Sequence, residues 1–144
     1  MSDLIFKVEG VAETQTRITA KARHFSIVID EPPVLGGEDL GANPVEYLLA
    51  SYAGCVNVVA YLIAGELNIK LDRLTIEVNG NINPAKLFGK LPEERAGFKQ
   101  INLNLKPETS ASPELIEKWL NEIKRRCPIN DNLQNPTPVS ISLS

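Results

Sequence analysis

A run of eighteen residues without a charge, residues 47–64, limits most strongly what this chain can fold into. The residues just before it form a helix start. Asn43 can cap, Pro44 suits the first helical position, and Glu46 stands three residues after the cap, as in a capping box. The pattern therefore predicts a long helix over residues 43–67 that is apolar nearly all round.

A helix of this composition either crosses a membrane or lies at the centre of a soluble fold. The charge-free run contains Ser51, Gly54 and Asn57, and neither flank carries a basic cluster. A spanning helix usually needs about 20 predominantly apolar residues and is oriented by flanking Lys and Arg. We therefore expect a buried core helix and no membrane association.

The composition is that of an ordinary globular protein. The chain has 144 residues, of which 43% are hydrophobic, and a formal net charge of −3. This length fits one domain, residues 1–144, and the charge gives no positive field for nucleic acid. The first residues carry Asp3 and Lys7 and no apolar run of a signal peptide. We expect a cytoplasmic protein with reduced thiols.

The order of the expected elements indicates an α+β fold. A second helix is expected to open at Ser112-Pro113-Glu114 and to end at Pro128, with Trp119 and Ile123 on its apolar face and Cys127 continuing that face. A hairpin turn is expected at residues 21–24, and residues 30–41 should be a loop. Alternating or apolar runs predict strands at residues 4–9, 14–20, 25–29, 74–79, 101–105 and 139–143.

Few residues in this chain can carry chemistry. The single histidine, His24, argues against a His-rich metal site and a Ser-His-Asp triad, and we expect it in a turn. We expect no metal and no cofactor. The two cysteines, Cys55 and Cys127, are not arranged as CxxC; each lies on the apolar face of an expected helix, where a thiol is often a packing residue. Basic residues precede Cys127 and favour a thiolate, whereas the helix C-terminus opposes one.

Three segments together resemble the OsmC/Ohr family. They are NPVEYLLASYAGC at residues 43–55, RRCPINDNL at residues 125–133, and the closing PVSISL. The order of elements agrees over nearly the whole chain. The residues before the first segment, IDEPPVLGGEDLGANP, are more similar to the general OsmC-like branch than to the well-described hydroperoxide enzymes.

The resemblance implies antiparallel strands around long central helices in an intertwined homodimer, with active sites formed between subunits. It also implies thiol peroxidase chemistry, in which Cys55 attacks an organic hydroperoxide and becomes a sulfenic acid. Cys127 then condenses with it to a disulfide that an external dithiol reduces. An arginine from the hairpin region of the partner subunit would lower the thiol pKa. Arg23 is the first match for it and Arg17 the second.

The chain departs from the family at one position. The hydroperoxide enzymes carry an arginine-orienting glutamate directly after the NP pair, where this chain has Val45. Glu46 is one residue later, which rotates it by about 100° around the helix. It also lies about two and a half turns before Cys55, on the opposite face of a regular helix. We therefore expect Glu46 to cap its helix rather than to serve the cysteine.

The sequence leaves three functions open. The first is an enzyme, a dithiol-dependent peroxidase for organic hydroperoxides with Cys55 peroxidatic and Cys127 resolving. The second is a protein of the same fold that binds a small hydrophobic molecule without turnover, and the third is a redox sensor using a Cys55–Cys127 disulfide. Val45 favours the second or third, and the presence of both cysteines favours the first. Sequence spacing does not show whether the two thiols meet.

Overall fold

The chain folds into two compact units. The computed structural model describes all residues from Met1 to Ser144, and the units are Met1–Leu48 and Leu49–Ser144. The boundary falls within the long helix α1, Pro44–Glu66. The expected helix over residues 43–67 is therefore confirmed, with Asn43 in place as its cap.

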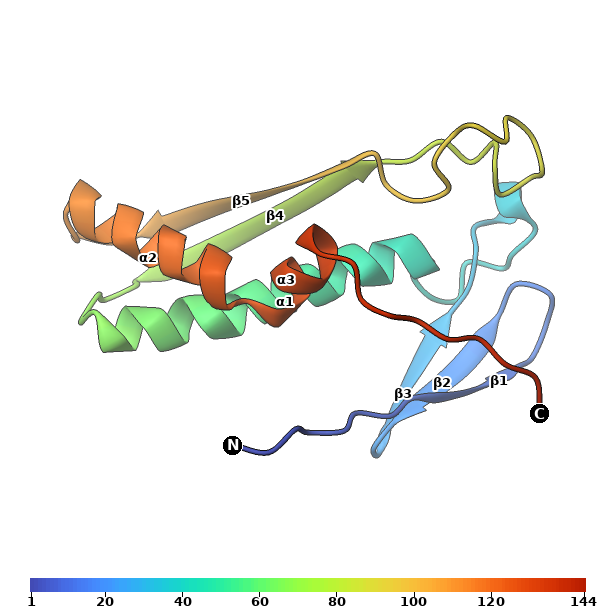
Figure 1. Cartoon of the computed structure of the whole chain (residues 1–144), viewed down its shortest axis with the longest axis horizontal. Coiled ribbons are helices and arrows are strands. Elements are labelled where there is room, and N and C mark those ends of the chain that lie inside the picture. Colours follow the sequence, from blue (N-terminus) through green and yellow to red (C-terminus); the bar gives the residue numbers. More distant parts are fainter. The chain divides into compact units, whose positions relative to one another are not determined.

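The first unit is built on a three-stranded antiparallel sheet in the order β1-β2-β3 (Figure 1). The strands are β1 (Glu9–Ala12), β2 (Ile18–Ala22) and β3 (Phe25–Ile29), and Ala20 at the centre of β2 is buried. The expected strand over residues 25–29 is confirmed. The expected hairpin turn is shorter than predicted and consists of Arg23 and His24 alone.

The other two N-terminal strands begin later in the sequence than predicted. The expected strand at residues 4–9 forms instead at Glu9–Ala12, and the one at residues 14–20 begins only at Ile18. Side-chain hydrogen bonds explain the second error, because Thr14 Oγ1 accepts the backbone N–H groups of Thr16 and Arg17. These local bonds fold the backbone into a turn where the alternating pattern indicated a strand.

A buried carboxylate organises the loop after β3, which contains a short 3₁₀ helix, η1 (Pro33–Leu35). Asp30 is fully buried and accepts hydrogen bonds from Thr16 Oγ1 and from three backbone N–H groups, those of Glu31, Glu38 and Leu40. Burial alone would raise its pKa, but these donors together hold the pKa below its usual value. Gly41 lets the loop return along β3, since a Cβ there would lie 2.2 Å from the Val28 carbonyl oxygen.

The capping box at the start of α1 forms as predicted. Asn43 Oδ1 accepts the backbone N–H of Glu46 (2.9 Å), and Glu46 Oε2 accepts the backbone N–H of Asn43 (2.8 Å). One turn later, the Tyr47 hydroxyl donates to the Val28 carbonyl oxygen (2.7 Å). These bonds fix the first turn of the helix within the first unit.

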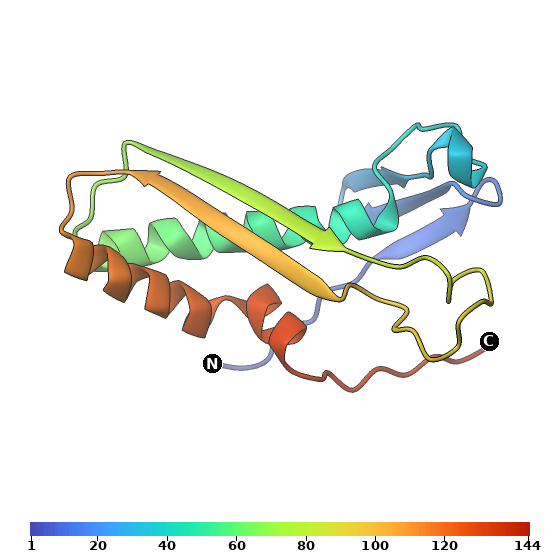
Figure 2. The same ribbon diagram turned by 90° about the horizontal axis from the view of Figure 1, so that it is seen from above.

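The second unit combines the rest of α1 with a two-stranded hairpin and two further helices. Strands β4 (Arg73–Asn81) and β5 (Gln100–Glu108) are antiparallel, and α2 (Pro113–Arg126) and α3 (Pro128–Gln134) follow them. The hairpin lies along α1 and α2 and covers one side of both (Figure 2). Inward and outward side chains alternate along both strands. The inward side chains of the hairpin pack on the core; they are Leu74, Ile76, Leu103 and Leu105.

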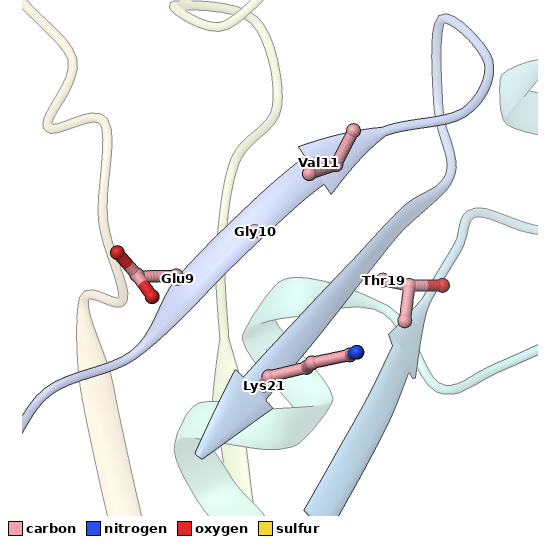
Figure 3. Close-up of a pocket in the computed structure, with 5 residues that line it drawn as sticks. All are labelled: Glu9, Gly10, Val11, Thr19 and Lys21. Atoms are coloured by element: carbon pink, nitrogen blue, oxygen red, sulfur yellow. The ribbon is translucent and has the colours of Figure 1, made fainter. Parts of the chain in front are cut away.

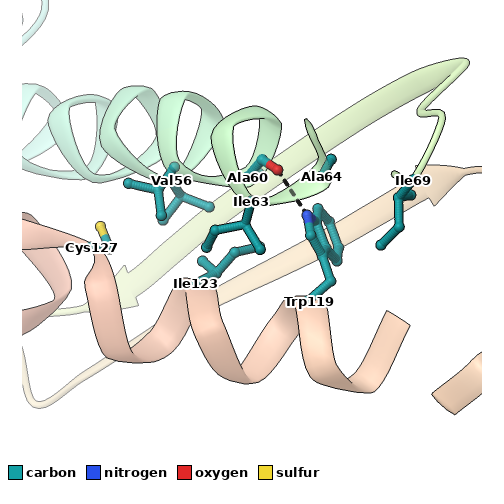
Figure 4. Packing of buried hydrophobic residues seen from close by; sticks show 9 residues of the cluster. Val56, Ala60, Ile63, Ala64, Ile69, Trp119, Ile123 and Cys127 are labelled. Atoms are coloured by element: carbon teal, nitrogen blue, oxygen red, sulfur yellow. Dashed lines mark hydrogen bonds between the residues drawn. The ribbon is translucent and has the colours of Figure 1, made fainter. Parts of the chain in front are cut away.

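Helix α2 packs against α1 through its single apolar face (Figure 4). Trp119 is 1% exposed, and its indole N–H donates to the Ala60 carbonyl oxygen of α1 (2.8 Å). Ile123 of α2 and Ile63 of α1 are buried beside it. Ser112 caps α2 by accepting the N–H of Leu115, as its position in the sequence predicts.

The C-terminal region differs from the prediction in two places. Pro128 does end α2, but it also begins α3, because proline lacks only an N–H that a first helical residue does not use. The expected strand at residues 139–143 does not form in the chain, and its apolar side chains Val139, Ile141 and Leu143 are exposed. A strand needs a neighbour to accept its backbone hydrogen bonds, and the chain pairs no strand with this segment.

One chain covers only part of α1. By length and hydropathy (1.7 on average) the helix could cross a membrane, and 28% of its most apolar window is buried within the chain. The side chains of Val59, Ala60 and Ile63 face the core, whereas Val58 is 67% and Leu62 54% exposed. The expectation of a buried core helix is thus met on one face only.

Candidate functional site

The two cysteines meet in the core of the second unit. Cys55 lies in the middle of α1, and Cys127 occupies the junction between α2 and α3. Both are free thiols, and the Cys127 Sγ–H donates to Cys55 Sγ across 3.2 Å. Cys127 is 1% exposed and its side chain points toward α1 beside Val56, while Cys55 is partly exposed (Figure 4). The thiol pair left open by the sequence therefore exists in the structure.

The surroundings of Cys55 disfavour its thiolate. Burial raises the pKa of the Cys55 thiol, a hydrogen bond from the backbone N–H of Ile129 lowers it in part, and the second thiol raises it again. The last effect is expected, because two thiolates at this distance would repel each other. Within residues 49–144, no lysine or arginine is among the groups that shift this pKa.

A hydrogen-bonded chain runs beside the two sulfurs. The Tyr52 hydroxyl on α1 donates to Asn130 Oδ1 on α3 (2.7 Å), and Asn130 Nδ2 donates to the Lys124 carbonyl oxygen on α2 (2.8 Å). Burial raises the pKa of Tyr52, and negative charge on Cys127 or Cys55 raises it further. Tyr52 is therefore a neutral hydroxyl donor close to both thiols.

The basic residues before Cys127 are held by carboxylates. Arg126 makes a bidentate pair with Glu66 at the end of α1, with Nη2 to Oε1 at 2.9 Å. Arg125 makes a bidentate pair with Glu122 on its own helix, with Nη2 to Oε2 at 2.7 Å. Their positive charges are thus largely compensated, and Arg126 also fastens the end of α2 to α1.

The two candidate arginines lie in the first unit in different settings. Arg17 bonds to Glu13 (2.9 Å) and to Glu38 (2.6 Å), and these hydrogen bonds raise its pKa. Arg23 is exposed in the hairpin turn with a left-handed backbone (φ 56°), and its guanidinium lies 5.0 Å from the centre of the Phe25 ring. His24 is a turn residue as expected, with its ring 4.0 Å from that of Phe25.

Each unit contains a hollow. In the second unit, a cavity of about 100 Å³ lies between α1, β5, α2 and α3. It is lined by Tyr52, Val56, Leu103, Leu105, Leu120, Ile123, Lys124 and Asn130. In the first unit, an open hollow of about 760 Å³ lies over β1 and β2 (Figure 3). It carries Glu9, Gly10, Val11, Thr19 and Lys21 and no cysteine.

Sequence reasoning did not find Tyr52 and Asn130 as part of the site. A signal was present, since Tyr52 stands three residues before Cys55 and Asn130 three residues after Cys127. Tyrosine and asparagine are common in any helix, however, and their contact spans 78 residues of sequence. Sequence spacing does not reveal a contact between residues so far apart along the chain.

The chain is similar to known proteins over most of its length. The family model for OsmC-like proteins matches residues 36–142. Hydroperoxide reductases of Mycoplasma pneumoniae and Mycoplasma genitalium are 24% and 23% identical to it over 142 and 144 residues, with 99% of this chain and 96% of each relative covered. The crystal structure of an OsmC-like protein from Mycoplasma pneumoniae superposes with a TM-score of 0.80 at 24% identity, covering 94% of this chain and 91% of that one.

Proposed function

Because this chain belongs to the OsmC-like family and has its α+β fold, we propose that it is a thiol-dependent reductase of organic hydroperoxides. Cys55 acts as the peroxidatic cysteine and Cys127 as the resolving one. The observation that carries the proposal is the 3.2 Å approach of two free thiols from different helices. Two relatives that match over nearly the whole chain are called hydroperoxide reductases, which supports the same chemistry.

The reaction has three steps. The Cys55 thiolate attacks the outer peroxide oxygen, an S–O bond forms, the O–O bond breaks, and the alkoxide leaves and takes up a proton as the alcohol. The Cys127 thiolate then attacks the sulfur of the Cys55 sulfenic acid, the S–S bond forms, and hydroxide leaves as water. An external dithiol returns both thiols by exchange, and we place the reaction in the cytoplasm, where such reductants are abundant.

The geometry of the site favours the second step, the formation of the Cys55–Cys127 disulfide. A disulfide has an S–S length of about 2.05 Å, so sulfurs that start 3.2 Å apart need to approach by only about 1 Å. The greater exposure of Cys55 suits a thiol that must meet a peroxide, and the burial of Cys127 protects the resolving thiol from it. Each cysteine thus has the access that its proposed role requires.

The first step needs a cation, because the pKa of Cys55 is raised within its own unit. We propose that Arg23 of a second subunit supplies it, because Arg23 is exposed in the hairpin turn and no carboxylate compensates its charge. Arg17 is the alternative. Glu13 and Glu38 hold its guanidinium in place, but they also compensate its charge.

A second function has one observation in its favour. The cavity of about 100 Å³ in the second unit is lined mostly by apolar side chains and has room for a small hydrophobic molecule, bound without turnover. The same thiol pair could also act as a redox sensor, which forms its disulfide slowly and is not recycled. Both alternatives predict slow oxidation by peroxide, and rapid turnover would exclude them.

The test is the reaction of the thiols with cumene hydroperoxide or tert-butyl hydroperoxide. One equivalent should remove both thiols and leave an intramolecular Cys55–Cys127 disulfide, detected by mass spectrometry. Cys127→Ser should stop at a sulfenic acid on Cys55, and Cys55→Ser should lose the fast reaction. Equal and slow oxidation of the two single variants would contradict the proposal, because it would mark two ordinary buried cysteines.

A further inference from the structure

We propose that Tyr52 and Asn130 are positioning residues that hold Cys127 on Cys55 and so set the rate of disulfide formation. Their hydrogen bond joins α1 to α3 across 2.7 Å, next to the thiol contact that joins α1 to the α2–α3 junction. We call Tyr52, Asn130 and the Lys124 carbonyl the latch. The inference rests on the proposed dithiol function and concerns the resolving step of that same site.

The latch encloses the residue that it positions. Asn130 Nδ2 donates back to the Lys124 carbonyl, so one side chain spans the turn in which Cys127 lies. The Asn130 amide oxygen accepts a hydrogen bond from the Tyr52 hydroxyl. The segment that follows Cys127 is thus tied to α1 by this bond as well as by the contact between the two sulfurs.

Apolar packing holds Cys127 in the core but holds the helix after it only lightly. Cys127 is 1% exposed, whereas helix α3 has seven residues of which none is buried, and Ile129 is its one apolar residue packed against the core. The junction backbone at Cys127 is extended (φ −74°, ψ 116°), so no continuous helix fixes it either. Hydrogen bonds therefore set the final orientation of the Cys127 sulfur relative to Cys55, after helix packing has brought the two residues together.

The position of the Cys127 sulfur relative to Cys55 matters more for disulfide formation than for the reaction of Cys55 with an oxidant. Attack of Cys127 on an oxidised Cys55 is intramolecular, and its rate depends on how often the two sulfurs are aligned. Attack of Cys55 on an external oxidant does not use the Cys127 sulfur, so its rate does not depend on that alignment. Loss of one hydrogen bond of ordinary strength should slow the resolving step about three- to tenfold and leave the first step unchanged.

The experiment uses an aromatic disulfide, 5,5′-dithiobis(2-nitrobenzoate), in parallel with cumene hydroperoxide. Cys55 attacks the reagent and releases one coloured thiolate, and Cys127 then attacks the mixed disulfide at Cys55 and releases the second. The two releases report the two steps separately, without any peroxide chemistry. Tyr52→Phe, which keeps the ring and removes the hydroxyl, should slow only the second release.

Three further variants decide between positioning and a merely structural role. Asn130→Leu should slow the second release at least as much, and Tyr52→Phe combined with it should add nothing, because the two share one bond. Tyr61→Phe, on the same helix, is the matched control and should resemble the unmodified protein. With peroxide, Tyr52→Phe should also accumulate more sulfinic acid on Cys55, since its sulfenic acid lives longer.

Two results would overturn the latch. One is a second release in Tyr52→Phe that is as fast as in the unmodified protein. The other is an equal slowing of both releases, which would show a general loss of structure. If peroxide leaves the thiols intact while the two releases behave as expected, the proposed function fails and the latch stands.

Discussion

At the scale of single residues, the chemistry of this chain depends on which charges are already paired. Glu46 is bound by the backbone of Asn43, and Arg126 by Glu66, so neither is available to Cys55. Cys55 itself is left with a raised pKa. On the proposed function, the cation that lowers this pKa therefore comes from outside the second unit.

The pH dependence of Cys55 alkylation tests which arginine lowers the pKa of Cys55. A raised pKa leaves less thiolate at a given pH, so losing the activating cation should move the alkylation curve to higher pH and slow the reaction near neutrality. We expect this shift for Arg23→Met, a smaller one for Arg17→Met, and none for Glu46→Gln. Rates of iodoacetamide labelling, measured by mass spectrometry from pH 6 to 10, give the three curves.

Glu46→Gln is also the control for folding. Glutamine makes the same reach to the Asn43 N–H and loses only a favourable charge at the helix start, so unfolding free energy should fall by less than about 1 kcal/mol. A shift of the alkylation curve in this variant as large as in Arg23→Met would refute the assignment of Glu46 to the cap alone. If Arg17→Met alone shifts the curve, Arg17 is the cation.

At the scale of elements, the pairing of α1 with α2 determines where the thiols lie. Trp119 joins the two helices by burial and by its bond to Ala60, and the Arg126–Glu66 pair joins them near the α2 C-terminus. Cys127 is the residue that follows. The distance between the sulfurs is thus a consequence of helix packing, to which the latch adds the final orientation.

Replacing Trp119 measures the strength of this packing. Trp119→Phe removes the indole donor and part of the ring volume, so we expect a loss of about 2 kcal/mol, smaller than the about 3–5 kcal/mol typical of truncating a buried tryptophan to alanine. Urea unfolding followed by circular dichroism gives the value. If the Trp119→Phe variant is as stable as the unmodified protein, the hydrogen bond to Ala60 and the lost ring volume contribute little to the stability of the core.

At the scale of the whole molecule, one chain leaves too much apolar surface exposed. Val58 and Leu62 on α1 face solvent, as do Leu4, Ile5 and Phe6 before the first strand and Ile141 near the C-terminus. Exposed apolar surface of this extent marks an interface. We propose that a second copy covers it, which agrees with the homodimer implied by the family resemblance and with a cation supplied from another subunit.

Light scattering at micromolar concentration should show a dimer. Val58→Lys combined with Leu62→Lys introduces two charges on the exposed face of α1, which should shift the protein to monomers and slow peroxide oxidation of Cys55. Glu117→Lys, an exposed change on α2, is the matched control and should remain dimeric. A well-folded monomer of the unmodified chain at this concentration would rule out the proposed assembly.

What the sequence determined by itself is local. The capping box of α1, the Ser112 cap of α2, the strand over residues 25–29 and the apolar face with Trp119 all depend on residues a few positions apart, whose spacing alone fixes their geometry. The same short-range logic failed where side chains compete with the backbone, as at Thr14, and at residues 139–143, where a strand has no neighbour in its own chain.

Only the tertiary structure decided what the cysteines can do. The sequence offered two thiols on two helix faces, but their 3.2 Å approach depends on how α1 and α2 pack, and 72 residues separate them. The Tyr52–Asn130 bond and the carboxylate partners of Arg126 arise in the same way. Such contacts are set by the burial of whole elements against one another, and no spacing along the chain encodes that arrangement directly.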